Sequence, residues 1–246
     1  MTDGAERFAA RYPTVWHVIE AEGAGPWLSA TGLLPAASLL GLAGLATDHA
    51  NRDDFRPLAL GEDRVAVLRP QLMADHRLAP TLAGSFAGRP GAWRAHINAH
   101  VFFWTEPRRR DAFLRACLRW RSRGRAAHAS APPVVLALDT AALLARHGQS
   151  AFFARINTGS TVRGGARVRR DEATLAPVAG YRSGPVAELA IRGCVQPGGW
   201  LVHPNSGLGC SQRERCLSRP SSAGQPPPPD PPPSRELGDG TLVRPA

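Results

Sequence analysis

The stretch VAELAI, residues 186–191, decides the fold, because it predicts a β-strand that carries a carboxylate in the middle of an apolar run. Glutamate is depleted in strands, whose half-buried pleated surface favours branched and aromatic side chains. Alternation places Glu188 on one face with Val186 and Ala190, and the small Ala190 would leave room for a ligand beside the carboxylate. Two interpretations follow. Glu188 lies in a ligand pocket, or it is a charge that protects an exposed sheet edge from aggregation.

The composition is that of a globular protein large enough to bury a real core. The chain has 246 residues, of which 43% are hydrophobic and 20% are charged. Its formal net charge of +10 would suggest a polyanionic partner. All 30 basic residues are arginine, however, and this bias, together with abundant Ala, Gly and Pro, is typical of a GC-rich genome. Nucleic-acid binding is therefore left open by the charge.

Cysteine spacing and hydropathy predict a cytoplasmic protein without a metal site or a membrane span. The N-terminus carries Asp3 and Glu6 and has no apolar signal core. The apolar stretch 33–46 is interrupted by Pro35 and is too short to cross a bilayer. No C-x-x-C pair occurs among the four cysteines, which are Cys117, Cys194, Cys210 and Cys216.

Strands and helices are predicted to alternate along residues 14–191. Strands are expected at 14–19, 64–69, 100–104, 133–139, 151–156 and 186–191. Helices are expected near 26–32, 35–45, 93–99, 106–121 and 141–147, the last with Thr140 as its cap. Residues 51–61 and 75–91 predict loops and short turns.

This order of elements favours an α+β domain built on a split antiparallel or mixed sheet with flanking helices. The sequence contains neither G-x-G-x-x-G nor a Walker sequence, so a doubly wound nucleotide-binding fold has no support. We expect the domain to span residues 1–200. Residues 201–246 include the run PPPPDPPP and predict a disordered, proline-rich tail.

Three strand features carry the candidate chemistry: His17, the aromatic strand HVFFW at residues 100–104, and Glu188. Each has a structural alternative. A histidine on an apolar strand face is often part of the core, and so are the rings of Phe103 and Trp104. Their order along the chain, histidine first, aromatic next and glutamate last, supports a functional interpretation.

That order resembles the histidine–aromatic–glutamate branch of the ADP-ribosyltransferase fold. The opening YPTVWHVIEAEGAGPWLSATGLL, residues 12–34, is similar to the start of bacterial DNA ADP-ribosyltransferase toxins, and HVFFW, VVLALD and VAELAI follow in the same order. The chain more closely resembles an uncharacterised bacterial family with the signatures WH…HGLL, LN..VFFW, INTG.T and VAELAV. Here these are WHVI…TGLL, INAHVFFW, INTGST and VAELAI, and the resemblance covers residues 11–197.

The resemblance implies that NAD is the substrate; the expectation of no metal rests on the cysteine spacing. The histidine of the first strand, here His17, would hold a ribose hydroxyl. The glutamate of the last strand, here Glu188, would stabilise the oxocarbenium-like transition state as nicotinamide leaves. An aromatic ring would stack on nicotinamide. Phe103 and Trp104 are the candidates, and they lie on opposite strand faces, so at most one of them can serve.

For the remaining residues, more than one candidate or more than one role stays open. An arginine should neutralise the pyrophosphate, and Arg52 and Arg69 are the candidates. In the INTGST loop, Asn157 and Thr158 either contact the ligand or close a turn. The arginines between residues 108 and 125 either bind nucleic-acid phosphates or form a solvated helix face.

The function implied is an NAD-dependent ADP-ribosyltransferase whose acceptor is a nucleobase or a protein side chain. Two alternatives share this fold: a catalytically inactive nucleotide-binding or interaction module, and an RNA phosphotransferase-like activity. The sequence leaves the acceptor and the oligomeric state open.

Overall fold

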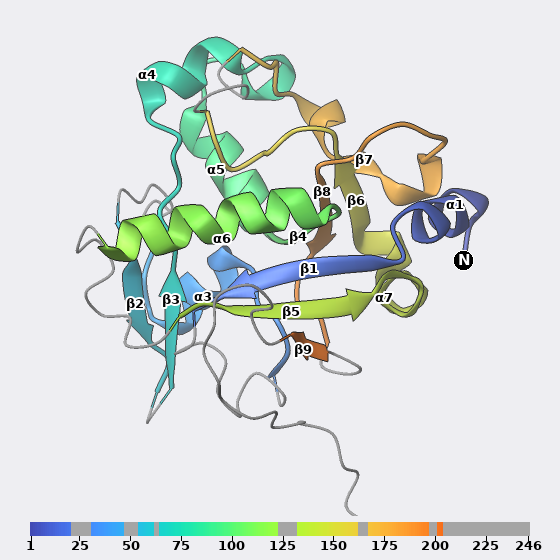
Figure 1. Ribbon diagram of the computed structural model, residues 1–246. Helices are drawn as coiled ribbons and strands as arrows, with labels where there is room; N and C mark the ends of the chain where they lie inside the picture. Colours follow the sequence, from blue (N-terminus) through green and yellow to red (C-terminus); the bar gives the residue numbers. More distant parts are fainter. Residues whose placement is uncertain are drawn as a thin grey trace, which may run out of the picture. The chain divides into compact units, whose positions relative to one another are not determined.

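The computed structural model describes residues 1–20, 31–46, 54–61, 64–122, 132–161, 167–196 and the backbone of 201–203 (Figure 1). All of these belong to one compact unit, Met1–Gln212, and the second unit, Arg213–Ala246, lies outside the described residues. Arg52, the proline-rich run and residues 26–30 of the helix expected near 26–32 also lie outside them.

Among the described residues, seven strands form one sheet in the order β7-β6-β8-β4-β1-β5-β9. Every strand pair in it is antiparallel, which confirms the α+β class. The bounds are β1 (Thr14–Ile19), β4 (His100–Trp104), β5 (Val134–Asp139), β6 (Ala151–Ala154), β7 (Ala176–Pro177), β8 (Glu188–Arg192) and β9 (Leu201–His203). Because β9 pairs with β5, residues 201–203 belong to the sheet and not to the expected tail.

The sheet is weakest between β1 and β4, in its middle. β1 pairs with β5 along its whole length, from Thr14 to Ile19, but with β4 only where Trp16 faces Trp104. β1 and β4 therefore diverge beyond that pair, and side chains connect the two strands where the backbone pairing ends.

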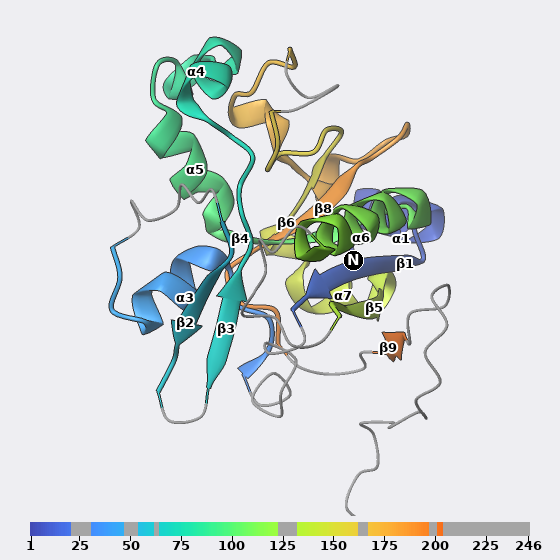
Figure 2. The ribbon, with the colours of Figure 1, turned by 60° about the vertical axis from the view of Figure 1, so that its left-hand side comes forward.

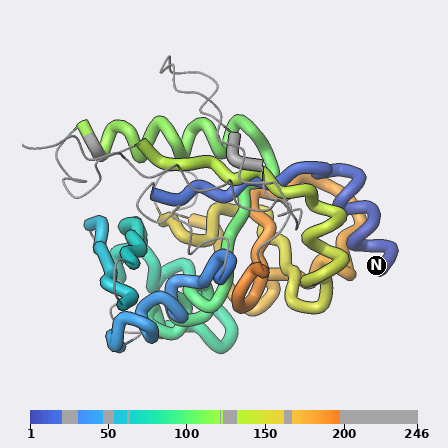
Figure 3. Tube along the Cα trace, turned by 90° about the horizontal axis from the view of Figure 1, so that it is seen from below, coloured from blue at the N-terminus to red at the C-terminus, as the bar shows by residue number. Residues whose placement is uncertain are grey.

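One face of the sheet packs against α1 (Asp3–Arg11) and α7 (Thr140–His147), which lie side by side (Figure 3). Helix α1, which was not predicted, places the fully buried Phe8 among the rings of Tyr12, Phe153 and Tyr181. Each large apolar side chain buried in this way contributes about 1.5–3 kcal/mol. Helix α7 is capped by Asp139, whose carboxylate accepts a 2.7 Å bond from the Ala142 amide, so the expected cap at Thr140 is wrong by one residue.

The other face carries α6 (Pro107–Ser122), which crosses β1 and β4 (Figure 1). Beside it stand α3 (Ala36–Leu42) and a hairpin of β2 (Arg56–Ala59) and β3 (Val65–Leu68), joined through Leu40, Leu58 and Leu68 (Figure 2). The loop expected over 51–61 is therefore wrong at β2.

Short helices complete the described structure around residues 75–98 and 148–180. They are α4 (Asp75–Leu78), η3 (Ala79–Thr81), η4 (Gly84–Phe86), α5 (Pro90–Asn98), η5 (Gly148–Ser150), η7 (Glu172–Thr174) and η8 (Val178–Gly180). Helix α5 leads directly into β4, which fixes the position of the residues at their junction.

Candidate functional site

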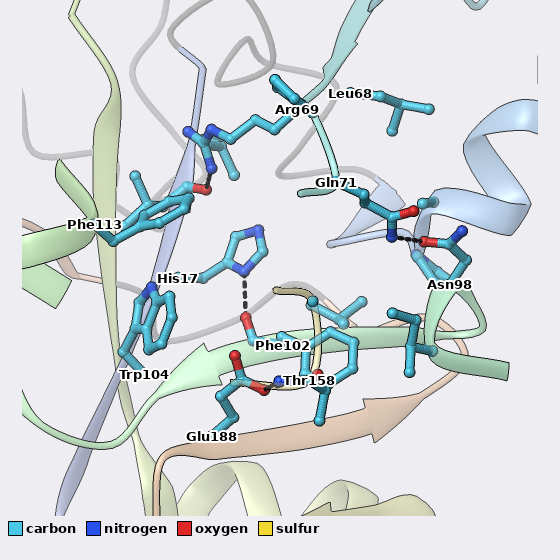
Figure 4. A pocket seen from close by; sticks show the side chains of 18 of the residues that line it. His17, Leu68, Arg69, Gln71, Asn98, Phe102, Trp104, Phe113, Thr158 and Glu188 are labelled. Atoms are coloured by element: carbon cyan, nitrogen blue, oxygen red, sulfur yellow. Dashed lines mark hydrogen bonds between the residues drawn. The ribbon is translucent and has the colours of Figure 1, made fainter. Parts of the chain in front are cut away.

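His17 occupies the gap where β1 and β4 diverge. Its Nδ1 lies 2.7 Å from the carbonyl oxygen of Phe102, so the side chain replaces a missing backbone bond between the two strands (Figure 4). A carbonyl can only accept, and Nδ1 therefore carries the proton of the neutral ring. Nε2 is left as an acceptor turned away from Phe102.

The electrostatic surroundings keep this histidine neutral. Burial lowers the pKa of His17 to about 4, the bond to the Phe102 carbonyl opposes the shift, and the positive charge of Arg69 adds to it. At neutral pH the ring can thus accept a hydrogen bond at Nε2 and carries no charge.

Glu188 opens β8, an inner strand that lies between β6 and β4. The residue is 4% exposed, so the hypothesis that it protects an exposed edge is wrong. The backbone amide and the hydroxyl of Thr158 donate to its Oε2 at 2.9 and 2.8 Å. Oε1 receives no hydrogen bond from the described residues and points into the open space beside His17 (Figure 4).

Burial also shifts the protonation of this carboxyl. It raises the pKa of Glu188 to about 7, although the two bonds from Thr158 and the charges of Arg109 and Arg170 pull the pKa down. At neutral pH the group is divided between its ionised and protonated forms, which is the condition suited to proton transfer.

The loop that carries Thr158 is tied firmly to its neighbours. The Thr161 amide and hydroxyl both donate to the carbonyl of Leu72 at 3.0 Å. Arg170, which is fully buried, donates at 2.7 Å to the carbonyl of Ser160. Asn157 accepts a 3.1 Å bond from the Gly159 amide, which closes a turn, and it also lines the open space.

His17 and Glu188 line one cleft of about 870 Å³. This volume lies within the range of small-molecule sites in proteins. Strands β1, β4 and β8 form one wall, and a single face of α6 forms another. Residues of α6 in the lining are Arg109, Ala112, Phe113, Ala116, Arg119 and Trp120.

The two aromatic candidates, Trp104 and Phe103, lie in different surroundings. Trp104 is the cross-strand neighbour of Glu188, lines the cleft and packs against Phe113 at a ring distance of 5.4 Å. Phe103 is 1% exposed and packs in the core with its ring 5.6 Å from that of His17, so its proposed stacking role is wrong. Phe102, which the sequence did not single out, is partly exposed in the cleft.

The space expected beside Ala190 does not exist. Ala190 is fully buried and is packed by Phe102 and Phe152 in a small cluster of its own. The room next to the carboxylate comes from the divergence of β1 and β4 and not from this small residue.

Arg69 lines the cleft but is held by several partners. Its Nε lies 2.8 Å from the Oε1 of the buried Glu20, its Nη1 donates to the Val18 carbonyl, and its guanidinium lies 5.2 Å from the centre of the Phe113 ring. Arg109 and Arg119 reach the same cleft from α6. Helical spacing on α6 was the signal that could have identified them, because residues 109, 112, 116 and 119 share one face.

A pair of amide side chains forms a further part of the cleft wall. The Nε2 of Gln71 donates to the Oδ1 of Asn98 at 2.6 Å (Figure 4). Gln71 follows β3 and Asn98 ends α5, so the pair joins two elements on one side of the cleft.

Residues 13–196 match the model of a Family of unknown function (DUF7002), and this match covers well over half of the chain. The chain belongs to this family. The DUF7002 segment starts one residue before β1 and ends beyond β8, so it contains His17, Thr158 and Glu188. No curated protein and no solved structure matches the chain.

None of the described helices of this DUF7002 member has the length and apolarity needed to span a bilayer. Within the described residues, no group of three or more His, Cys, Asp and Glu side chains is arranged to hold a metal ion.

Proposed function

We propose that the cleft binds NAD and that the protein is an ADP-ribosyltransferase. The observation that carries the proposal is that His17 and Glu188, from opposite ends of the domain sequence, line the same cleft, each with an acceptor atom that receives no hydrogen bond from the described residues. A ribose offers adjacent hydroxyl groups that such a pair of acceptors can hold together.

In this proposal His17 positions the nicotinamide ribose, and Glu188 acts on the reacting centre. The bond between the ribose carbon and the nicotinamide nitrogen breaks, its electron pair leaves with nicotinamide, and positive charge develops on the ribose. The Oε1 of ionised Glu188 stabilises that charge. The acceptor then bonds to the ribose carbon and loses a proton, which the carboxylate can take up.

The arginines of α6 supply the charge that a dinucleotide needs. Arg109 and Arg119 are ten residues apart on one helix, which corresponds to about 15 Å along its axis. They line the cleft with guanidinium groups that complement a pyrophosphate. Arg109 also makes a 3.2 Å ion pair with Glu106, and the charge of Arg69 is paired with that of Glu20.

A binding module without catalysis is the second candidate. It is favoured by the pKa of Glu188 near 7, which leaves a sizeable share of the carboxyl protonated at neutral pH and unable to stabilise positive charge. Such a module would bind the same nucleotide and release no nicotinamide.

The test is a thermal shift and a calorimetric titration of the full chain with millimolar NAD. A ligand that binds only the folded state stabilises it by about 2.7 kcal/mol at a hundred times its Kd. We expect a rise in Tm for the wild type. No change in Tm and no heat of binding would refute the proposal, and binding without nicotinamide release would select the module.

A further inference from the structure

The Gln71–Asn98 pair has hydrogen-bonding capacity that the described residues do not use. The Oε1 of Gln71 and the Nδ2 of Asn98 are buried and have no partner there. Asn98 as a whole is 5% exposed, and both residues line the cleft. Native proteins pair most buried polar atoms, so two unpaired atoms on neighbouring side chains call for a ligand or bound water.

The chemistry of the two atoms defines what would complete them. One is an acceptor and the other is a donor, and they belong to amides already joined by a 2.6 Å bond. A carboxamide carries the complementary groups, an NH₂ donor and a carbonyl acceptor on one carbon. A carboxylate in its place would offer no donor to Gln71.

A flat ring has a surface to pack on beside the pair. The ring of Phe102 lies between the Gln71–Asn98 amides and Thr158, and all of these line the cleft (Figure 4). Offset stacking of aromatic rings adds about 0.5–1.5 kcal/mol to the burial of their surface. Beyond Thr158 stands Glu188, so a ring at Phe102 would place an attached sugar near that carboxylate.

We infer that Gln71, Asn98 and Phe102 form the subsite for a ring that bears a carboxamide, which in NAD is nicotinamide. Asn98 Nδ2 donates to the carboxamide oxygen, and Gln71 Oε1 accepts from its NH₂ group, after both amide side chains, whose unpaired atoms are buried, turn toward the ligand. This assignment rests on the proposed function, because it names the part of the nucleotide that these residues select.

The experiment compares three dinucleotides by calorimetry on the full-length wild type. They are NAD, nicotinic acid adenine dinucleotide, in which a carboxylate replaces the carboxamide, and nicotinamide hypoxanthine dinucleotide, which is altered only at the adenine. We expect the first analogue to bind about tenfold more weakly than NAD or worse, the effect of one buried hydrogen bond left unmade. The second analogue should bind within about twofold of NAD, since its carboxamide is unchanged.

The variant Gln71→Met keeps the length of the side chain and removes its amide. We expect it to bind NAD and nicotinic acid adenine dinucleotide with equal affinity. Equal affinities in the wild type would overturn the inference while leaving NAD binding, and so the proposed function, intact. Weaker binding of the hypoxanthine analogue alone would also overturn the inference, because the amide pair would then bind the adenine ring and not the carboxamide.

Free nicotinamide and free nicotinic acid separate the two proposals further. Selective binding of nicotinamide without any binding of NAD would support the subsite and refute the proposed function. Binding of neither compound and of no dinucleotide would refute both.

Discussion

Replacing Glu188 with glutamine should stabilise the protein in a way that depends on pH. Burial raises the pKa of the Glu188 carboxyl from its usual 4.5 to about 7 in the folded state. The folded protein therefore holds a proton that the unfolded chain releases, and stability is lost as the pH rises from 4.5 through 7. At about 1.4 kcal/mol per pH unit, this range corresponds to about 3 kcal/mol.

Glu188→Gln removes the titration and keeps a side-chain oxygen for the two bonds from Thr158. We expect the variant's advantage in unfolding free energy to grow from near zero at pH 4.5 to about 3 kcal/mol at pH 8. Urea denaturation followed by tryptophan fluorescence at several pH values measures this. His17 titrates in both proteins, so its contribution cancels.

The matched control is Glu172→Gln. A hydrogen bond with Ser85 lowers the pKa of Glu172 to about 2, so this carboxyl stays ionised from pH 5 to 8 and the control difference should be constant there. If the Glu188→Gln difference were equally constant, Glu188 would not be a buried carboxyl with a raised pKa, and the description of the site would be wrong.

Three other changes probe the cleft. Thr158→Val removes the hydroxyl bond to Glu188 and should raise the pKa of the carboxyl further, so the pH midpoint of nicotinamide release should move upward. Thr158→Ser should restore the midpoint, and an unmoved midpoint would mean that the hydroxyl does not lower the pKa of Glu188. His17→Ala should weaken NAD binding at least about tenfold in a fluorescence titration, and an unchanged Kd would exclude the histidine from the ligand site. Arg109→Gln should raise the Kd for NAD and lessen its dependence on salt, whereas Arg115→Gln, on an exposed part of α6 outside the cleft, should alter neither; equal effects would assign both to general surface charge.

Five of the seven described strands of the central sheet, β1, β4, β5, β6 and β8, were predictable because each is a largely apolar run between breaks in the sequence, whereas the short β7 and β9 were not predicted. β4, β5, β6 and β8 all lie within two residues of their expected bounds. β2 escaped prediction because it contains Pro57 and only Leu58 of its four residues is buried, which gives no apolar pattern to detect. Its partner β3 alternates more clearly and was found.

The residue types of the candidate site were predictable from the sequence, but the strand face on which each side chain lies was less so. Glu188 and His17 were found as polar side chains on strands. Which aromatic ring joins them depends on strand register, because pairing Trp104 with Glu188 puts Trp104 and Phe102 on the cleft side and turns Phe103 into the core. Alternation within one strand cannot supply that register.

Which arginines of α6 line the cleft was harder still to predict from the sequence. Arg109 lines the cleft and Arg115 does not, because the two leave α6 in different directions, and which direction faces the cleft is fixed by how the helix crosses β1 and β4. The Gln71–Asn98 pair likewise joins a strand end to a helix end that no local pattern connects.

The most direct test of the account is the rate at which the full-length protein releases nicotinamide from NAD, with water as the acceptor, measured chromatographically at pH 8. The wild type should release nicotinamide, and Glu188→Gln should lower the rate by about a hundredfold or more while changing the Kd for NAD only a few-fold, because the carboxylate acts on the transition state. Equal rates for the two proteins would contradict the role assigned to Glu188.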